Sequence, residues 1–186
     1  MTVLKLNDGN RIPALGLGIW QIPADQTARI VTTALDLGYG LIDGAAIYGN
    51  EEGLGHGVQD AARPREQVFV TTKIWNDRQG HDETLRAFDE AVARLGTQPD
   101  LLLIHWPCPE KGLYLDTWRA MIRLRDEGRA GSIGVSNFLP EHLDRIIEAT
   151  GVVPAVNQIE LHPGFAQREL RAFHDKHGIA TESWSP

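Results

Sequence analysis

The chain has 186 residues, 42% of them hydrophobic and 23% charged, with a formal net charge of −7 at pH 7. These values are those of an ordinary globular domain, exclude a disordered or fibrous chain, and disfavour nucleic acid or an acidic membrane as a partner. The single cysteine, Cys108, excludes an internal disulfide and a multi-cysteine zinc site, and with neither a signal-peptide pattern nor a membrane-length apolar run we expect a cytoplasmic protein.

The first elements are two short extended runs, residues 3–6 and 11–13, on either side of the sequence Asn-Asp-Gly-Asn. An Asp-Gly pair between extended runs is typical of a tight hairpin. We expect this hairpin to cap the fold and not to join its core sheet. Residues 14–18 then predict a first core strand, with glycines where a backbone or a cofactor can approach closely.

Helical and extended patterns alternate along the rest of the chain. Apolar residues recur with helical spacing, and several of these runs end at a glycine. The intervening strands are nearly continuous apolar runs, which fits a parallel sheet that is buried on both faces. The predicted strands after the first lie near residues 41–42, 68–70, 101–104, 133–135, 153–159 and 179–184.

Polar or aromatic residues follow nearly every predicted strand. An open sheet concentrates its ligands at one switch point, whereas a β/α barrel collects them from the ends of all its strands. We therefore predict a barrel. The pattern supplies seven core strands, one fewer than a closed barrel of this type needs. The strand-end residues are Asp43, Lys73, His105, Asn137, Gln158 and Trp184.

Four of the residues near these strand ends can form one proton-donating site. Asp43 ends a strand, Tyr48 lies in the loop that follows it, and Lys73 and His105 end the next two strands. Taken singly, each has a structural explanation, such as an ion pair between Asp43 and Lys73 or a packed tyrosine. Together they combine an acid, a nearby ammonium and a hydrogen-bond donor.

The order of these residues resembles that of the aldo-keto reductases, most closely the bacterial 2,5-diketo-gluconate reductase branch. The likeness extends over the whole chain, and one local departure is Gly44, where the family usually has Thr or Ser. We expect this glycine to remove a hydroxyl from the cofactor side. The matched segments are residues 43–51, Lys73, 105–107, 132–138, 156–163 and 182–186.

The resemblance implies a parallel (β/α)8 TIM barrel with an N-terminal β-hairpin cap, as a single domain over residues 1–186. In the family a further stretch brings the eighth strand, a segment that grips the 2′-phosphate and a loop over the substrate. We expect these residues to be part of a longer protein. A true truncation and strand exchange between copies are the alternatives.

The resemblance also implies NADPH-dependent reduction of aldehydes or ketones, such as keto-sugar acids or small dicarbonyls, by a monomer. Tyr48 would supply the proton, with its pKa lowered by Lys73; Asp43 would hold Lys73, and His105 would fix the carbonyl oxygen. The alternative is a nicotinamide-binding or regulatory protein without turnover. The implied cofactor residues are Gly18, Ile19, Asp43, Ser136, Asn137, Gln158, Trp184 and Ser185. The implied substrate residues are Trp20, Tyr48, Trp75, His105 and Trp106.

Other chemistries fit the sequence less well. The glycines at 16 and 18 and at 53, 55 and 57 lack the dinucleotide-binding spacing, and the serines at 132 and 136 only approach a nucleophile elbow. His174 and His177 are spaced for one helix face, but no third ligand is suggested, so we expect a solvated polar face and no metal. Trp118 and Met121 are predicted to be core residues of a helix.

Overall fold

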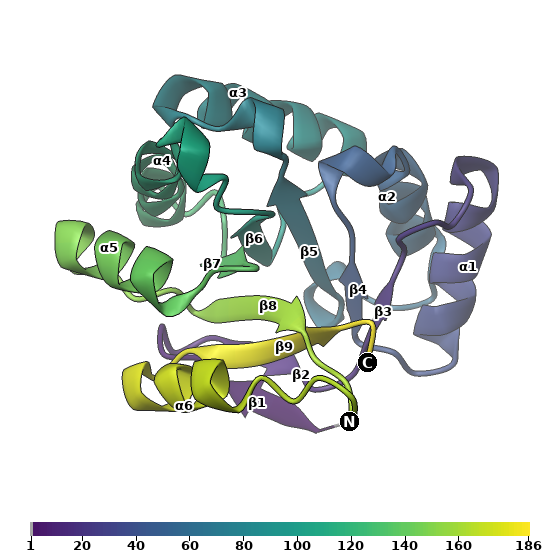
Figure 1. Ribbon diagram of the computed structural model, residues 1–186. Helices are drawn as coiled ribbons and strands as arrows, with labels where there is room; N and C mark the ends of the chain where they lie inside the picture. The colour runs from purple at the N-terminus through teal and green to yellow at the C-terminus, as the bar shows by residue number, and fades with distance from the viewer. Residues whose placement is uncertain (1) are drawn as a thin grey trace.

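The computed structural model describes residues 2–186. One seven-stranded parallel sheet dominates it, and each strand pairs with the next one along the chain. The sheet curls into a nearly closed barrel wall with helices around its outer side (Figure 1). The predicted α/β barrel with seven core strands is therefore confirmed. The strands are β3 (Gly16–Gly18), β4 (Leu41–Asp43), β5 (Phe69–Ile74), β6 (Leu101–Ile104), β7 (Ser132–Ser136), β8 (Val156–Glu160) and β9 (Ala180–Trp184).

One helix lies in each connection between successive core strands. Several helices end at a glycine with positive φ, such as Gly96 at 65° and Gly151 at 71°, because a left-handed backbone closes the last helical turn without strain. No helix within residues 2–186 has the length and apolar character needed to cross a membrane. The helices are α1 (Ala24–Asp36), α2 (Glu51–Asp60), α3 (His81–Leu95), α4 (Tyr114–Asp126), α5 (Pro140–Thr150) and α6 (Arg168–His177).

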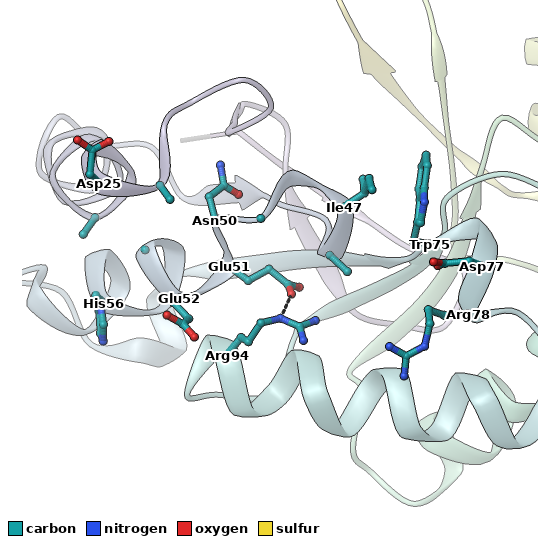
Figure 2. A pocket seen from close by; sticks show the side chains of 15 residues that line it. Asp25, Ile47, Asn50, Glu51, Glu52, His56, Trp75, Asp77, Arg78 and Arg94 are labelled. Carbon is teal, nitrogen blue, oxygen red and sulfur yellow. Dashed lines mark hydrogen bonds and ion pairs between the residues drawn. The ribbon is translucent and has the colours of Figure 1, made fainter.

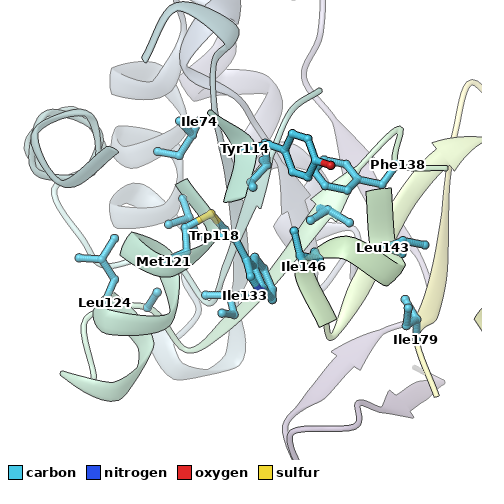
Figure 3. Close-up of a cluster of buried hydrophobic side chains, with 14 of the residues drawn as sticks. Ile74, Tyr114, Trp118, Met121, Leu124, Ile133, Phe138, Leu143, Ile146 and Ile179 are labelled. Carbon is cyan, nitrogen blue, oxygen red and sulfur yellow. The ribbon is translucent and has the colours of Figure 1, made fainter. Parts of the chain in front are cut away.

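The main hydrophobic core lies between the sheet and the helices that cover it. Trp118 and Met121 of α4 are fully buried there, packed with Ile133 of β7 and Ile146 of α5 (Figure 3). Their burial confirms that both are core residues. Fully burying one such side chain contributes about 1.5–3 kcal/mol, so this layer fixes the strands whose ends carry the site.

The hairpin of β1 (Val3–Lys5) and β2 (Arg11–Pro13) closes the end of the barrel where the strands begin. Leu6 and Ile12 are buried against the inward-facing residues Leu41 and Leu101. The side chain of Asn7 donates a hydrogen bond of 2.9 Å to the carbonyl oxygen of residue 154. The hairpin is thus the predicted cap, and it leaves the opposite end of the barrel for the site.

Side chains inside the barrel are arranged in layers, because alternate strand residues face inward. Above the apolar layer next to the hairpin, the strands bring polar residues into the interior. Gly18 pairs with Asp43, and Gln158 pairs with Glu182. A polar layer inside a barrel is where burial shifts pKa values most, so it is the place to look for chemistry.

The glycines of α2 allow three helices to pack closely. A Cβ atom on Gly55 would lie 2.2 Å from the carbonyl oxygen of Leu95, and one on Gly57 would lie 2.6 Å from that of Ala28. Neither distance leaves room for a side chain. The glycines of α2 therefore serve helix packing.

Candidate active site

Asp43 and Lys73 form an ion pair inside the barrel. Asp43 ends β4 and Lys73 lies on β5, and both side chains face the interior. The Lys73 Nζ atom lies 2.6 Å from Asp43 Oδ2 and donates a second hydrogen bond of 2.9 Å to the carbonyl oxygen of Gly44. Gln158 donates a hydrogen bond of 3.1 Å to the other carboxylate oxygen, Oδ1. Because Lys73 is 1% exposed, these partners replace the water that its charge would otherwise need.

Tyr48 completes a chain of three groups. It ends a short 3₁₀ turn over Ala46–Tyr48, and Gly49 closes this turn in the left-handed conformation. The next residue, Asn50, donates from its side chain to the carbonyl oxygens of Ile19 and Ile22, which fixes the loop to the end of β3. The Tyr48 hydroxyl lies 3.5 Å from Lys73 Nζ. The predicted grouping of an acid, an ammonium and a carboxylate is therefore present.

The balance of charges around Tyr48 differs from the expectation. Burial raises the pKa of the Tyr48 phenol, the ammonium of Lys73 lowers it, and Asp43 raises it, with a net upward shift. The expected lowering by Lys73 exists but is outweighed by burial. For Lys73, burial lowers the pKa, yet the charges of Asp43, Tyr48 and Glu182 outweigh it and leave the pKa raised. At neutral pH the phenol is protonated and the amine is charged.

His105 supplies a neutral imidazole beside this chain of groups. Its ring packs edge-on against Trp75, with centroids 4.8 Å apart, and against Tyr48, at 5.8 Å. Burial, assisted by the charge of Lys73, lowers the pKa of His105 to about 3. Within residues 2–186 its buried Nδ1 atom has no hydrogen-bond partner. A neutral ring of this kind donates one hydrogen bond and cannot act as a cation.

The residues expected on the nicotinamide side lie on the neighbouring strands and are joined to one another. Asn137 follows β7 with φ of 62°, and its Nδ2 donates to the carbonyl oxygen of His105 at 3.0 Å. The Trp184 indole donates to Asn137 Oδ1 at 2.9 Å. The hydroxyl of Ser136 donates to the carbonyl oxygen of Gln158 at 2.8 Å. This network brings the side chains to the same end of the barrel as Tyr48.

The remaining cofactor candidates lie at the rim of the barrel. A Cβ atom on Gly18 would meet nothing within 4 Å, so its backbone faces open space. Ser185 is exposed just after β9. Ile19 is different, because its side chain is fully buried on the helix side. Its backbone N–H donates to the carbonyl oxygen of Asp43, and its carbonyl oxygen accepts from the side chain of Asn50.

Gly44, which stands where the family usually has Thr or Ser, is explained by packing against a helix. A Cβ atom at this position would lie 2.8 Å from a methyl carbon of Leu54 in α2. A side chain here would therefore face helix α2, and the expectation of a hydroxyl lost from the cofactor side is wrong. Gly44 serves the site through its carbonyl oxygen, which binds Lys73.

The three tryptophans expected in the substrate pocket surround the barrel mouth to different extents. Trp75 packs against His105 and is partly buried. Trp20 is 61% exposed and Trp106 is 41% exposed. Gln79 anchors the loop of Trp106, since its Nε2 donates to the carbonyl oxygen of Trp106 at 2.7 Å. Exposed indoles at the mouth are free to contact a ligand.

A cavity of about 700 Å³ lies beside the site, between the ends of α1, α2 and α3 (Figure 2). Trp75 and Ile47 are among the residues that line it, but the four predicted catalytic residues are not. Across it Glu51, 2% exposed, is paired with Arg94 at 2.7 Å and accepts a hydrogen bond from Thr72. Glu51 thereby holds the first turn of α2 below the Tyr48 loop.

The sequence interpretation gave no role to Glu182, whose Oε2 atom is buried, and did not expect His174 to be buried. Glu182 lies among the inward-facing residues of the barrel, and its only sequence signal is its place two residues before Trp184 on an inward-facing position. His174 is fully buried, with ring nitrogens 2.9 Å from Asn157 and Thr181, so the expected solvated face of α6 is wrong at this residue. Within residues 2–186, no group of three or more metal-ligating side chains is found.

Comparisons with known proteins identify the family of this chain. A model described as the aldo/keto reductase family matches residues 14–186. An aldo-keto reductase of Mycobacterium sp. (strain JLS) is 57% identical over 185 residues, which are 99% of this chain and 67% of that protein. Methylglyoxal reductase DkgA of Escherichia coli (strain K12) is 47% identical over 186 residues, which are 100% of this chain and 67% of that protein.

A solved structure extends the comparison to the fold. A variant of Gox0644 in complex with NADPH is 54% identical, with a TM-score of 0.95 over 100% of this chain and 67% of that one. Its strands therefore follow the same course as the seven strands described above. Since the family model and a relative more than half identical both match nearly all of this chain, it belongs to the aldo/keto reductase family of oxidoreductases.

Proposed function

We propose that the protein reduces aldehyde or ketone carbonyls with NADPH, acting on small dicarbonyls or keto-sugar acids, and that Tyr48 supplies the proton. The observation that carries this proposal is the chain of groups from Asp43 through Lys73 to the Tyr48 hydroxyl, with the neutral ring of His105 beside it. The relative named methylglyoxal reductase supports a small dicarbonyl as the substrate.

The residues of the barrel rim fit a nicotinamide cofactor. The indole of Trp184 is partly exposed at the strand ends, and Gly18 leaves open space where a ligand can lie against the backbone. Ser136, Asn137 and Gln158 would hold the carboxamide, and Ser185 would begin the contacts to the pyrophosphate. When bound, the cofactor supplies a hydride to the substrate carbon. The NADPH complex of Gox0644 supports this choice of cofactor.

The proton would come from Tyr48. Its raised pKa keeps the phenol protonated at neutral pH, so the group is ready to donate. As negative charge develops on the substrate oxygen and then on the phenol, the ammonium of Lys73 stabilises it at short range. Asp43 keeps Lys73 charged and in place. The N–H of the neutral His105 ring would direct the carbonyl oxygen toward Tyr48.

The first experiment is a titration of the protein with NADPH, followed by tryptophan fluorescence. Stacking on Trp184 predicts saturable quenching that is weakened in Trp184→Ala. A turnover assay on methylglyoxal and 2,5-diketo-gluconate follows, with Tyr48→Phe as the inactive variant. Tight binding without turnover on a broad carbonyl panel would instead identify a nicotinamide-binding protein, and absence of binding by folded protein would refute the proposal.

A further inference from the structure

Glu182 lies in the polar layer next to the Asp43–Lys73 pair. It is the cross-strand neighbour of Gln158, whose side chain reaches Asp43, so both residues face the barrel interior. The adjacent residues face the other way: Thr181 contacts His174 of α6, and the Ser183 hydroxyl donates to the carbonyl oxygen of residue 161. The strand therefore directs the side chain of Glu182 toward the layer that holds the Asp43–Lys73 pair, which supports the proposed proton donor Tyr48.

The carboxyl group of Glu182 is poorly satisfied where it lies. Its Oε2 atom is buried, and within residues 2–186 it has no hydrogen-bond partner. A buried carboxylate without full hydrogen bonding is unfavourable, whereas the neutral acid is tolerated. The site has no structural need for a second carboxyl group, because Asp43 already neutralises Lys73. Glu182 is thus a second carboxyl group in the layer that holds the Asp43–Lys73 pair, and its Oε2 atom has no partner of its own within residues 2–186.

The charges around Glu182 make its ionisation state sensitive to pH. Burial and the negative charge of Asp43 raise the pKa of Glu182 to about 7, against the ammonium of Lys73 and a hydrogen bond from Gln158. On the same face, Glu160 lies two residues beyond Gln158 toward the rim. The ring of His174 lies on the other face of the sheet, against Thr181. The pKa of Glu182 is thereby brought close to neutral pH.

We propose that Glu182 is a positioning residue that controls Tyr48 through Lys73: neutral Glu182 leaves the ammonium to Asp43 and Tyr48, whereas ionised Glu182 competes for it and makes Tyr48 a poorer proton donor. This inference rests on the proposed role of Tyr48 as the acid. The sign follows from electrostatics, because one more negative charge near Lys73 disfavours formation of the phenolate. Reduction should slow as Glu182 ionises.

The direct test measures ionisation of Tyr48 without turnover. The ultraviolet absorbance of the phenolate is recorded against pH for wild type and for Tyr48→Phe, and the difference gives the Tyr48 titration. In Glu182→Gln this titration moves to lower pH. In Glu169→Gln, which removes one exposed carboxylate from α6, it does not move. An unchanged Tyr48 titration in folded Glu182→Gln would overturn the proposal.

The kinetic test uses the pH profile of kcat for carbonyl reduction. In wild type, kcat decreases with a midpoint near pH 7, where Glu182 ionises. The decrease is lost in Glu182→Gln and kept in Glu182→Asp. Glu182→Ala, in which the decrease is also lost, serves if the glutamine variant does not fold. A decrease that persists in Glu182→Gln counts against the role of Glu182. If no variant reduces a carbonyl, the proposed function fails, while the phenolate titration still decides whether Glu182 is coupled to Tyr48.

Discussion

The indole of Trp184 donates a hydrogen bond of 2.9 Å to the side-chain oxygen of Asn137, which joins the end of β9 to the loop after β7. Asn137 in turn binds the carbonyl oxygen of His105. A residue proposed to stack on nicotinamide is thus connected, through one amide, to the loop that carries the proposed carbonyl-binding histidine. The proposed cofactor site and the proposed carbonyl-binding site are therefore both held in place by Asn137.

Removing that hydrogen bond while keeping an aromatic ring should weaken cofactor binding moderately. Trp184→Phe loses the N–H donor, and a lost hydrogen bond of this kind is worth about 1 kcal/mol, or roughly fivefold in Kd. Trp184→Ala also loses the ring and should weaken binding more. Calorimetric titration with NADPH measures both. Equal affinities for Trp184→Phe and Trp184→Ala would show that the ring does not contact the cofactor.

Tyr48→Phe should lose the chemical step and keep the cofactor. Positioned acids contribute about 10²–10⁴ in rate, so kcat should fall by at least about a hundredfold, with little change in the Kd for NADPH. Tyr39→Phe is the matched control, because Tyr39 lies at the edge of the helix-side core. Near-normal kcat in Tyr48→Phe would require another proton donor.

Lys73→Met should destabilise the fold. The substitution leaves the carboxylate of Asp43 in the barrel without its ion pair, and breaking a buried pair from one side costs about 3–5 kcal/mol. In Lys73→Met combined with Asp43→Asn, much of that stability should return because the unpaired charge is gone. Urea unfolding of the single and double variants measures the difference. Equal stability of the two would mean that the pair is well solvated.

Acid should destabilise the protein partly through His105. The folded state holds the pKa of His105 at about 3, and the ordinary value is 6.5, so between these values the unfolded chain binds more protons. Stability from this residue is present above pH 6.5 and is lost as the pH falls toward 3. Unfolding free energies measured between pH 7 and pH 4 should decrease less steeply in His105→Gln. A slope equal to that of wild type would contradict the burial of the neutral ring.

The sequence was enough to predict the barrel and the meeting of Asp43, Lys73 and His105. Parallel strands end at the same edge, so residues at their carboxyl ends converge whatever the helices do. How deeply a side chain is buried is harder to predict from the sequence, because it depends on every neighbouring element at once. For this reason, only the structure showed three features. They are the net rise in the Tyr48 pKa, the burial of His174 and the close approach of Leu54 to Gly44.

Glu182 illustrates the same limit at the site itself. The strand β9 reads Ala-Thr-Glu-Ser-Trp, so its sequence alone does not tell which side chains face inward. The register of the strand decides this, and a shift of one residue would place the carboxylate outside. The pairing with Gln158 fixes that register. The structure therefore adds a residue to the candidate site that the strand pattern alone could not assign.

The sheet order, in which every core strand pairs with its sequence neighbour, also governs how the protein can fold. Each strand–helix unit can pair with the one made just before it, but each such parallel pairing must first close a loop that contains a whole helix, which makes the pairing slow. Asp43 meets Gln158 across 115 residues only after five strands have added to one another. During synthesis from the N-terminus, the proposed acid group of Asp43, Tyr48 and Lys73 is therefore made before the strands that carry Gln158 and Trp184.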